Sequence, residues 1–249
     1  MLPDTIVLLE DRGIFDTLNW IIDSNVGAIL EDSQNLSYNI SYTNDQDVNG
    51  DIWTFNSDPQ ISNNVDLNFQ ASDNHNGFSE VVISIKDDGG TTVDYLEDQN
   101  YGIGIDESES QTFYIKVLPV NDIPTFSYGI HDTLDEDSGL ITYRNWITNI
   151  SAGPSNESAQ HDSLEFNIVA YDKFWNVLNG VESAYPNNIL FKNPPILTIG
   201  LDDTTKAHLS FELNDNHNGL SYLRFSLDDK GGTDYSGLEI SQLVEKQLY

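Results

Sequence analysis

The sequence contains no cysteine, no long apolar run and few basic residues. Without cysteine the chain can form neither a disulfide nor a thiolate site. Because it has no stretch of about 18 consecutive apolar residues, we predict no transmembrane helix. The opening residues, MLPDTIVLLEDRG, lack the basic segment that begins a signal peptide. We therefore predict that the chain is a mature fragment or one segment of a longer protein.

Positive charge is scarce, since 10 Lys and Arg face 41 Asp and Glu and leave a net charge of −31. Such a charge disfavours nucleic acid and anionic membranes as partners, because both are themselves anionic. It favours cations, and many of the Asp residues lie in turn-like stretches that suit metal-binding loops. A solvated acidic coat is the alternative explanation. Hydrophobic residues make up 38% of the chain, which is enough for a packed core.

The chain is an internal repeat. The segment DNHNGFSEVVISIKDDGGT begins at Asp73, and DNHNGLSYLRFSLDDKGGT begins 142 residues later at Asp215. Trp20 and Trp146 also correspond, but at a spacing of 126 residues. The second copy therefore carries 16 extra residues, which we assign to KFWNVLNGVESAYPNN at 173–188. A repeat of this length is a whole domain, so we predict domains at 1–123 and 124–249.

Both copies have the pattern of β-strands. Apolar and polar residues alternate over 36–42, 65–71, 79–86, 111–117, 164–170, 207–213 and 220–227. Gly-Gly and Asn-Gly pairs supply turns, and no segment keeps a helical period. We predict an all-β protein of two tandem Greek-key β-sandwiches. Pro119 and Pro124 bracket an Asn-Asp pair and form the linker between them. Trp20 and Trp146 are expected to plug the space between sheets.

Several motifs resemble the cadherin-like, bacterial immunoglobulin-like tandem domains of large surface and adhesion proteins. An F-x-I-x-V strand runs into PVND-x-P at Phe113–Pro124, DED-x-G follows at Asp135–Gly139, and W-x-x-NIS-x-GP-x-NES-x-Q follows at Trp146–Gln160. The resemblance implies extracellular β-sandwiches in series, with Ca²⁺ at their junctions. The first domain departs from the pattern, because LEDRG and VGAILEDSQ replace DEDSG and SAGPSNESAQ.

Calcium takes six to eight oxygen ligands from carboxylates, carbonyls and side-chain amides. With the resemblance, this implies metal ligands among Glu10, Asp11, Asp87, Asp88, Asn121, Asp122, Asp135, Glu136 and Asp137. In cadherin-like junctions an acid of the first strand pairs with the downstream linker. That rule assigns Glu10 and Asp11 to the junction after the first domain, and Glu136 and Asp137 to one after the second. Asp87 and Asp88 are expected to face the first of these junctions together with Glu10 and Asp11, although the pair is equally explained as a good turn.

The resemblance implies a non-catalytic structural or adhesion module at the cell surface, with neighbouring repeats as partners. One alternative is a module that binds a cell-surface glycan or protein through Phe174, Trp175 and Tyr185 of the insertion. Another is a subunit of an extracellular filament. The sequence has no serine nucleophile elbow, no H-E-x-x-H and no phosphate loop. Its repeated acids lie in turns of both copies, so we predict no enzymatic activity.

Overall fold

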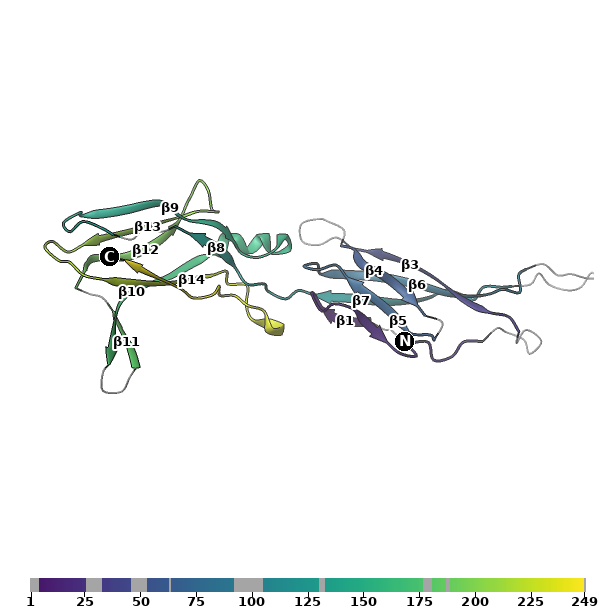
Figure 1. The fold of residues 1–249 in the computed structure, drawn as a ribbon. Coiled ribbons are helices and arrows are strands. Elements are labelled where there is room, and N and C mark those ends of the chain that lie inside the picture. Colours follow the sequence, from purple (N-terminus) through teal and green to yellow (C-terminus); the bar gives the residue numbers. More distant parts are fainter. Residues whose placement is uncertain are drawn as a thin grey trace, which may run out of the picture. The chain divides into compact units, whose positions relative to one another are not determined.

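The computed structural model describes residues 5–25, 33–45, 53–62, 64–91, 105–129, 133–176, 181–186 and 189–248, and it leaves the side chains of 172–186 undescribed. The chain divides into two compact units, Met1–Pro119 (unit 1) and Val120–Tyr249 (unit 2) (Figure 1). The boundary predicted after residue 123 lies just inside unit 2. No helix in the described residues is long and apolar enough to cross a membrane.

Unit 1 consists of two facing sheets. One has the strand order β1-β7-β6-β3, from β1 (Thr5–Leu9), β7 (Gln111–Leu118), β6 (Gly77–Asp87) and β3 (Leu36–Asn44). The other has the order β2-β5-β4, from β2 (Phe15–Thr17), β5 (Leu67–Ala71) and β4 (Phe55–Ile61). Strand β1 runs parallel to β7, whereas the other pairs are antiparallel.

Unit 2 also has two sheets, with one more strand among its described residues, and its first strand pairs with its second strand and not with its last. Its first sheet has the order β12-β13-β9-β8, from β12 (Phe191–Ile199), β13 (Ala207–Leu213), β9 (Leu140–Ser151) and β8 (Thr125–Tyr128). Its second has the order β11-β10-β14-β15, from β11 (Val181–Pro186), β10 (Glu165–Asn176), β14 (Ser221–Asp228) and β15 (Val244–Leu248). Two 3₁₀ helices, η2 (Ser155–Ser163) and η3 (Asp234–Ser236), lie between strands.

With β11 set aside, unit 2 has the strand order of the immunoglobulin fold, in which the first, second, fifth and fourth strands form one sheet and the third, sixth and seventh form the other. Unit 1 differs at its first strand, because β1 joins the sheet of β7, β6 and β3. Alternate residues of each strand face the other sheet. They bury Phe69, Val81 and Ile115 in unit 1, and Phe211 and Phe225 in unit 2. The predicted all-β sandwich fold is therefore confirmed.

The two tryptophans matched by the repeat lie at the cores. Trp146 is buried between the sheets of unit 2, and its ring centroid lies 5.3 Å from that of Phe225. Trp20 is half-buried and lies 4.6 Å from Phe113 by the same measure. Their expected role as plugs between sheets agrees with these positions.

The strand registers show that the extra residues of unit 2 do not form a single insertion but lie in more than one connection between strands. Ile40 and Ile168 occupy equivalent positions 128 residues apart, because they pair with the equivalent residues Ile83 and Phe225. Phe55 and Phe191 are likewise equivalent, 136 residues apart. Eight extra residues therefore fall between β10 and β12, where the β10–β11 hairpin forms within 173–188. Six more lengthen the β12–β13 hairpin, so the sequence-based assignment of all 16 to 173–188 was too narrow.

Candidate functional site

The residues before β8 are held against the loop that follows β14. Asn121 accepts a hydrogen bond at its carbonyl from the Leu238 amide (2.8 Å), and its Nδ2 donates to the Leu238 carbonyl (2.8 Å). The same Nδ2 lies 3.2 and 3.3 Å from the two carboxylate oxygens of Asp229. The side-chain oxygen of Asn121, Oδ1, takes part in none of these hydrogen bonds.

The 3₁₀ helix η2 adds a buried carboxylate. Pro154 precedes the helix, and its carbonyl accepts the Glu157 amide at 3.0 Å. Glu157 is only 5% exposed, and its Oε1 accepts a hydrogen bond from the Asp122 amide at 2.8 Å. Glu157 Oε2 and Asp122 Oδ2 are both buried atoms. Gly153 permits this arrangement, because a Cβ there would collide with Glu157 Oε2.

Two amide oxygens point at one place beside Gly231. Asn121 Oδ1 and Gln160 Oε1 both lie inside van der Waals contact of the position that a Cβ on Gly231 would occupy. Each of these oxygens is buried, and neither has a hydrogen-bond partner. A buried carbonyl oxygen without a donor costs free energy. A cation is one group that could offset this cost for both oxygens at once.

Asp229 completes the cluster, which we call the base cluster: Asn121, Asp122, Glu157, Gln160 and Asp229. The Asp229 side chain has no exposed surface, and it accepts a hydrogen bond from the Gly231 amide at 2.8 Å. Burial raises the pKa of the Asp229 carboxyl, and the hydrogen bonds from Gly231 and Asn121 partly offset that rise. A nearby cation would favour the ionised form.

The chemistry of the base cluster suits a hard cation. All its candidate donors are oxygens, from carboxylates and side-chain amides, which is the set that Ca²⁺ prefers. No three His, Cys, Asp or Glu side chains in the described part of the chain are close enough to share a metal ion. A metal here would therefore depend on the amide oxygens of Asn121 and Gln160 as well as on the acids. The residues present fit Ca²⁺ on these grounds.

The structure brings together only part of the predicted ligand set. Asn121 and Asp122 lie in the base cluster, whereas Glu10 and Asp11 lie where β7 ends, since the Glu10 amide donates to the Leu118 carbonyl at 2.9 Å. Glu10 is 3% exposed. Asp11 has a positive φ of 58° and accepts the Asn74 amide at 2.7 Å. Whether Glu10 and Asp11 bind metal stays a prediction.

Asp87 and Asp88 are not near Glu10 and Asp11. Strand β6 begins at Gly77, which pairs with Val117, and ends at Asp87 beyond the start of β7. The two acids therefore lie at the opposite end of unit 1 from Leu118, and the expectation that they join Glu10 and Asp11 does not agree with this register. Asp87 accepts the Gly89 amide at 2.8 Å. Asp88 accepts hydrogen bonds of 2.8 Å from the backbone and the side-chain nitrogen of Asn35, and these hydrogen bonds lower the pKa of the Asp88 carboxyl.

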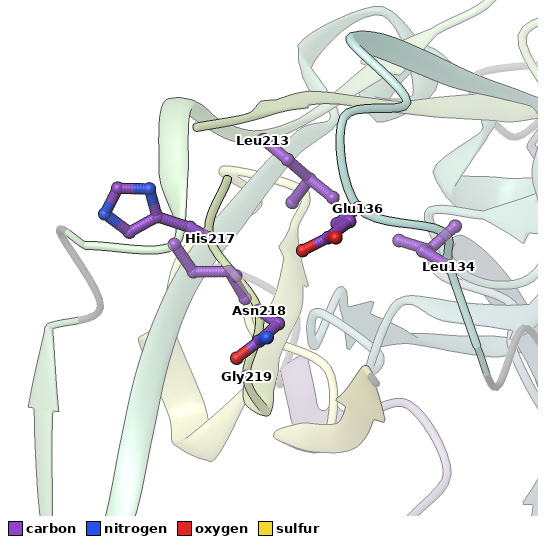
Figure 2. A pocket seen from close by; sticks show the side chains of 7 residues that line it. Leu134, Glu136, Leu213, His217, Asn218 and Gly219 are labelled. Atoms are coloured by element: carbon purple, nitrogen blue, oxygen red, sulfur yellow. The ribbon is translucent and has the colours of Figure 1, made fainter. Parts of the chain in front are cut away.

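Asp135, Glu136 and Asp137 surround a turn in unit 2 before β9. Asp137 repeats the geometry of Asp11, with a φ of 61° and a 2.6 Å hydrogen bond from the Asn216 amide. The Asp135 carbonyl accepts a hydrogen bond from Ser138 Oγ. Glu136 lines a small pocket with His217, Asn218 and Gly219 (Figure 2). Of the three carboxylates, Asp137 holds the Asn216 turn, and a metal role for the three acids stays a prediction.

Sequence reasoning missed Glu157, Gln160 and Asp229 as members of the base cluster. The signal was present, because Gln160 corresponds to Gln34 at the spacing of 126 residues and Asp229 to Asp87 at 142. Gln34 Oε1 is also buried without a hydrogen-bond partner, and its side chain lies against Gly89. The aromatic side chains of the insertion, Phe174, Trp175 and Tyr185, lie outside the described part of the chain.

No family model matches the chain, and no curated protein matches it. Among solved structures, it is similar to the tandem Ig repeats of Dlar at a TM-score of 0.21, with 11% identity over 100% of this chain and 96% of that one. It is also similar to the C-terminal domain of the AgI/II polypeptide BspA of Streptococcus agalactiae, at a TM-score of 0.17 with 9% identity over 86% and 83%. Both TM-scores are too low for either likeness to bear on function.

Proposed function

We propose that the chain is a non-catalytic extracellular module of a large surface or adhesion protein, built from tandem cadherin-like sandwiches and stabilised by Ca²⁺. The observation that carries this proposal is the base cluster of unit 2. Two buried amide oxygens without donors, Asn121 Oδ1 and Gln160 Oε1, lie beside a fully buried carboxylate in a chain of net charge −31. Neighbouring repeats of the same or a larger protein are the proposed partners.

Calcium at the base cluster would act on the folding of unit 2. Asn121 and Asp122 come from the segment before β8, Glu157 and Gln160 from η2, and Asp229 from the loop after β14. A cation bound to residues so far apart in sequence forms its site only in the folded unit. It therefore stabilises that unit by mass action. In a chain without cysteine, such a site does the work that disulfides do in other secreted domains.

The proposal predicts a calcium-dependent melting temperature. At a free Ca²⁺ concentration a hundredfold above Kd, the stabilisation is about 2.7 kcal/mol, which corresponds to a rise on the order of 10 °C. The measurement is calorimetric unfolding of the whole chain in calcium and in excess chelator, at matched ionic strength. Magnesium should give much less, because it demands octahedral geometry and keeps its waters.

A pair of charge-matched variants separates specific binding from screening. Glu157→Gln should remove most of the calcium-dependent shift. Asp162→Asn removes the same charge from an exposed residue of the same helix, and it should leave the shift intact. An equal response to magnesium, or equal behaviour of the two variants, would show that calcium only screens the acidic surface.

A further inference from the structure

The pentapeptide Asp-Asn-His-Asn-Gly occurs once in each unit, and its first half is built alike in both. The amide of its first Asn donates to an Asp in left-handed conformation, as Asn74 to Asp11 at 2.7 Å and Asn216 to Asp137 at 2.6 Å. The histidine Nδ1 lies 2.7 Å from the Asp73 carbonyl in unit 1, and 2.8 Å from the Asp215 carbonyl in unit 2. The two loops thus start from the same geometry.

In unit 1 the second half of the loop, Asn76 and Gly77, is held in place by Asp45 and Trp53, which we call the clamp. Gly77 already belongs to β6, pairs with Val117 and has a φ of 149°. A Cβ on it would lie 2.6 Å from Asp45 Oδ1 and 2.8 Å from the Trp53 ring. Asp45 Oδ1 accepts the Phe78 amide at 2.7 Å and Trp53 Nε1 at 3.0 Å. The Asn76–Gly77 peptide is therefore held between a strand, an indole and a carboxylate.

The same half is open in unit 2. Strand β14 begins only at Ser221, Asn218 and Gly219 are exposed, and no atom of the described residues lies within 4 Å of a Cβ built on Gly219. Strand equivalence puts Lys173 where unit 1 has Asp45, and a lysine cannot accept a hydrogen bond.

The indole of the clamp is missing as well. The position of Trp53 is taken by Ile189, which is 70% exposed. A small pocket lined by Leu134, Glu136 and the loop itself remains beside Asn218 (Figure 2). Neither group that holds the loop in unit 1 is thus present at the equivalent position of unit 2.

We propose that Asn218 is a site of spontaneous deamidation and that Asn76 is protected. The Gly219 backbone nitrogen attacks Cγ of Asn218, a C–N bond forms, and the side-chain nitrogen leaves as ammonia. Water then opens the resulting succinimide at either carbonyl and yields aspartate or isoaspartate. The step needs only water, and it needs a glycine nitrogen that can swing towards Cγ without a Cβ in the way. Gly219 meets that condition.

The modification changes the charge of this loop. It adds a carboxylate three residues after Asp215 in the sequence and at the pocket that Glu136 lines, in a chain that is already strongly acidic. The isoaspartate product also lengthens the backbone between Asn218 and Gly219. Unit 2 would thus acquire, with age, a loop that differs from the intact copy in unit 1.

The unit 1 loop is the internal control for the test. The native chain is incubated at neutral pH and physiological temperature, then briefly digested with chymotrypsin to give peptides 70–78 and 212–220. Mass spectrometry with fragmentation follows the mass gain of one deamidation at each Asn. Because Gly77 is held by its pairing with Val117 and by the hydrogen bonds that Asp45 makes to Phe78 and Trp53 beside it, we expect Asn218 to react faster than Asn76 by about tenfold. In denaturant the two should react at similar rates, since their sequences match.

Equal native rates, or a faster Asn76, would overturn the proposal. Gly219→Ala is the second arm, and it should fold normally because its Cβ meets open space. That variant should lose most of the mass gain at Asn218, since a Cβ hinders closure of the succinimide. A mass gain at Asn218 unchanged in Gly219→Ala would also contradict the proposed chemistry.

Discussion

Trp53→Ala is expected to destabilise unit 1 by about 3–5 kcal/mol. The Trp53 side chain has no exposed surface, and its ring centroid lies 4.9 Å from that of Phe55. Its Nε1 donates to Asp45 Oδ1 at 3.0 Å and lies 3.2 Å from the Phe78 carbonyl. Alanine would remove the buried indole, leave a cavity between the sheets and release the start of β6.

The equivalent residue of unit 2 provides the control. Ile189→Ala changes a side chain that is 70% exposed, so its cost should stay within about 0.5 kcal/mol. Because the chain has two units, unfolding is best followed by hydrogen exchange with mass spectrometry, which reports β6 and β14 separately. Similar losses for the two variants would contradict the difference in burial between Trp53 and Ile189 on which this prediction depends.

Local patterns in the sequence were sufficient to predict the fold. The alternation over 79–86 became β6 and that over 207–213 became β13, because a half-buried strand must place every second residue in the core. The matched Trp20 and Trp146 lie at the cores as expected. The buried Trp53 could not be predicted from the repeat, since unit 2 has Ile189 and no tryptophan at the equivalent position.

Strand direction explains why the structure brings together only part of the predicted ligand set. The sequence shows that Asp87 and Asp229 lie in matching Asp-rich turns, but not at which end of a sandwich those turns fall. Only pairing decides this: Asp229 meets Asn121 at the start of unit 2, and Asp87 lies at the end of β6 away from Leu118. Asn121 and Asp122 therefore lie together, but with neighbours that differ from those expected, and their role as metal ligands stays a prediction.

The location of the 16 extra residues of unit 2 also could not be predicted fully from the sequence. A single difference between two spacings gives the number of extra residues, not their location. The sequence offered one segment without a counterpart, 173–188, and the strand registers show that part of the surplus lies in the β12–β13 hairpin instead. Hairpins can lengthen at the surface without disturbing the core, so length alone carries little information about where they do so.

Gly231→Ala is expected to abolish calcium-dependent stabilisation of unit 2. A Cβ at this position would overlap Asn121 Oδ1 and Gln160 Oε1, the two buried oxygens without donors. Both would have to move away from the point at which they converge, and the cation would lose two neutral ligands together. At a calcium concentration a hundredfold above Kd, the loss is about 2.7 kcal/mol. The measurement is the difference in melting temperature between calcium and chelator for each protein.

Gly219→Ala is the matched substitution for this test, because its Cβ meets nothing within 4 Å and it lies in the loop before β14. It should keep the full calcium shift, whereas Gly231→Ala should melt at nearly the same temperature with and without calcium. In chelator Gly231→Ala should lose no more than about 1–3 kcal/mol, the usual cost of overpacking, so its unit 2 stays folded for the comparison. A full calcium shift in folded Gly231→Ala would place any calcium site outside the base cluster, because no cation could still use both amide oxygens.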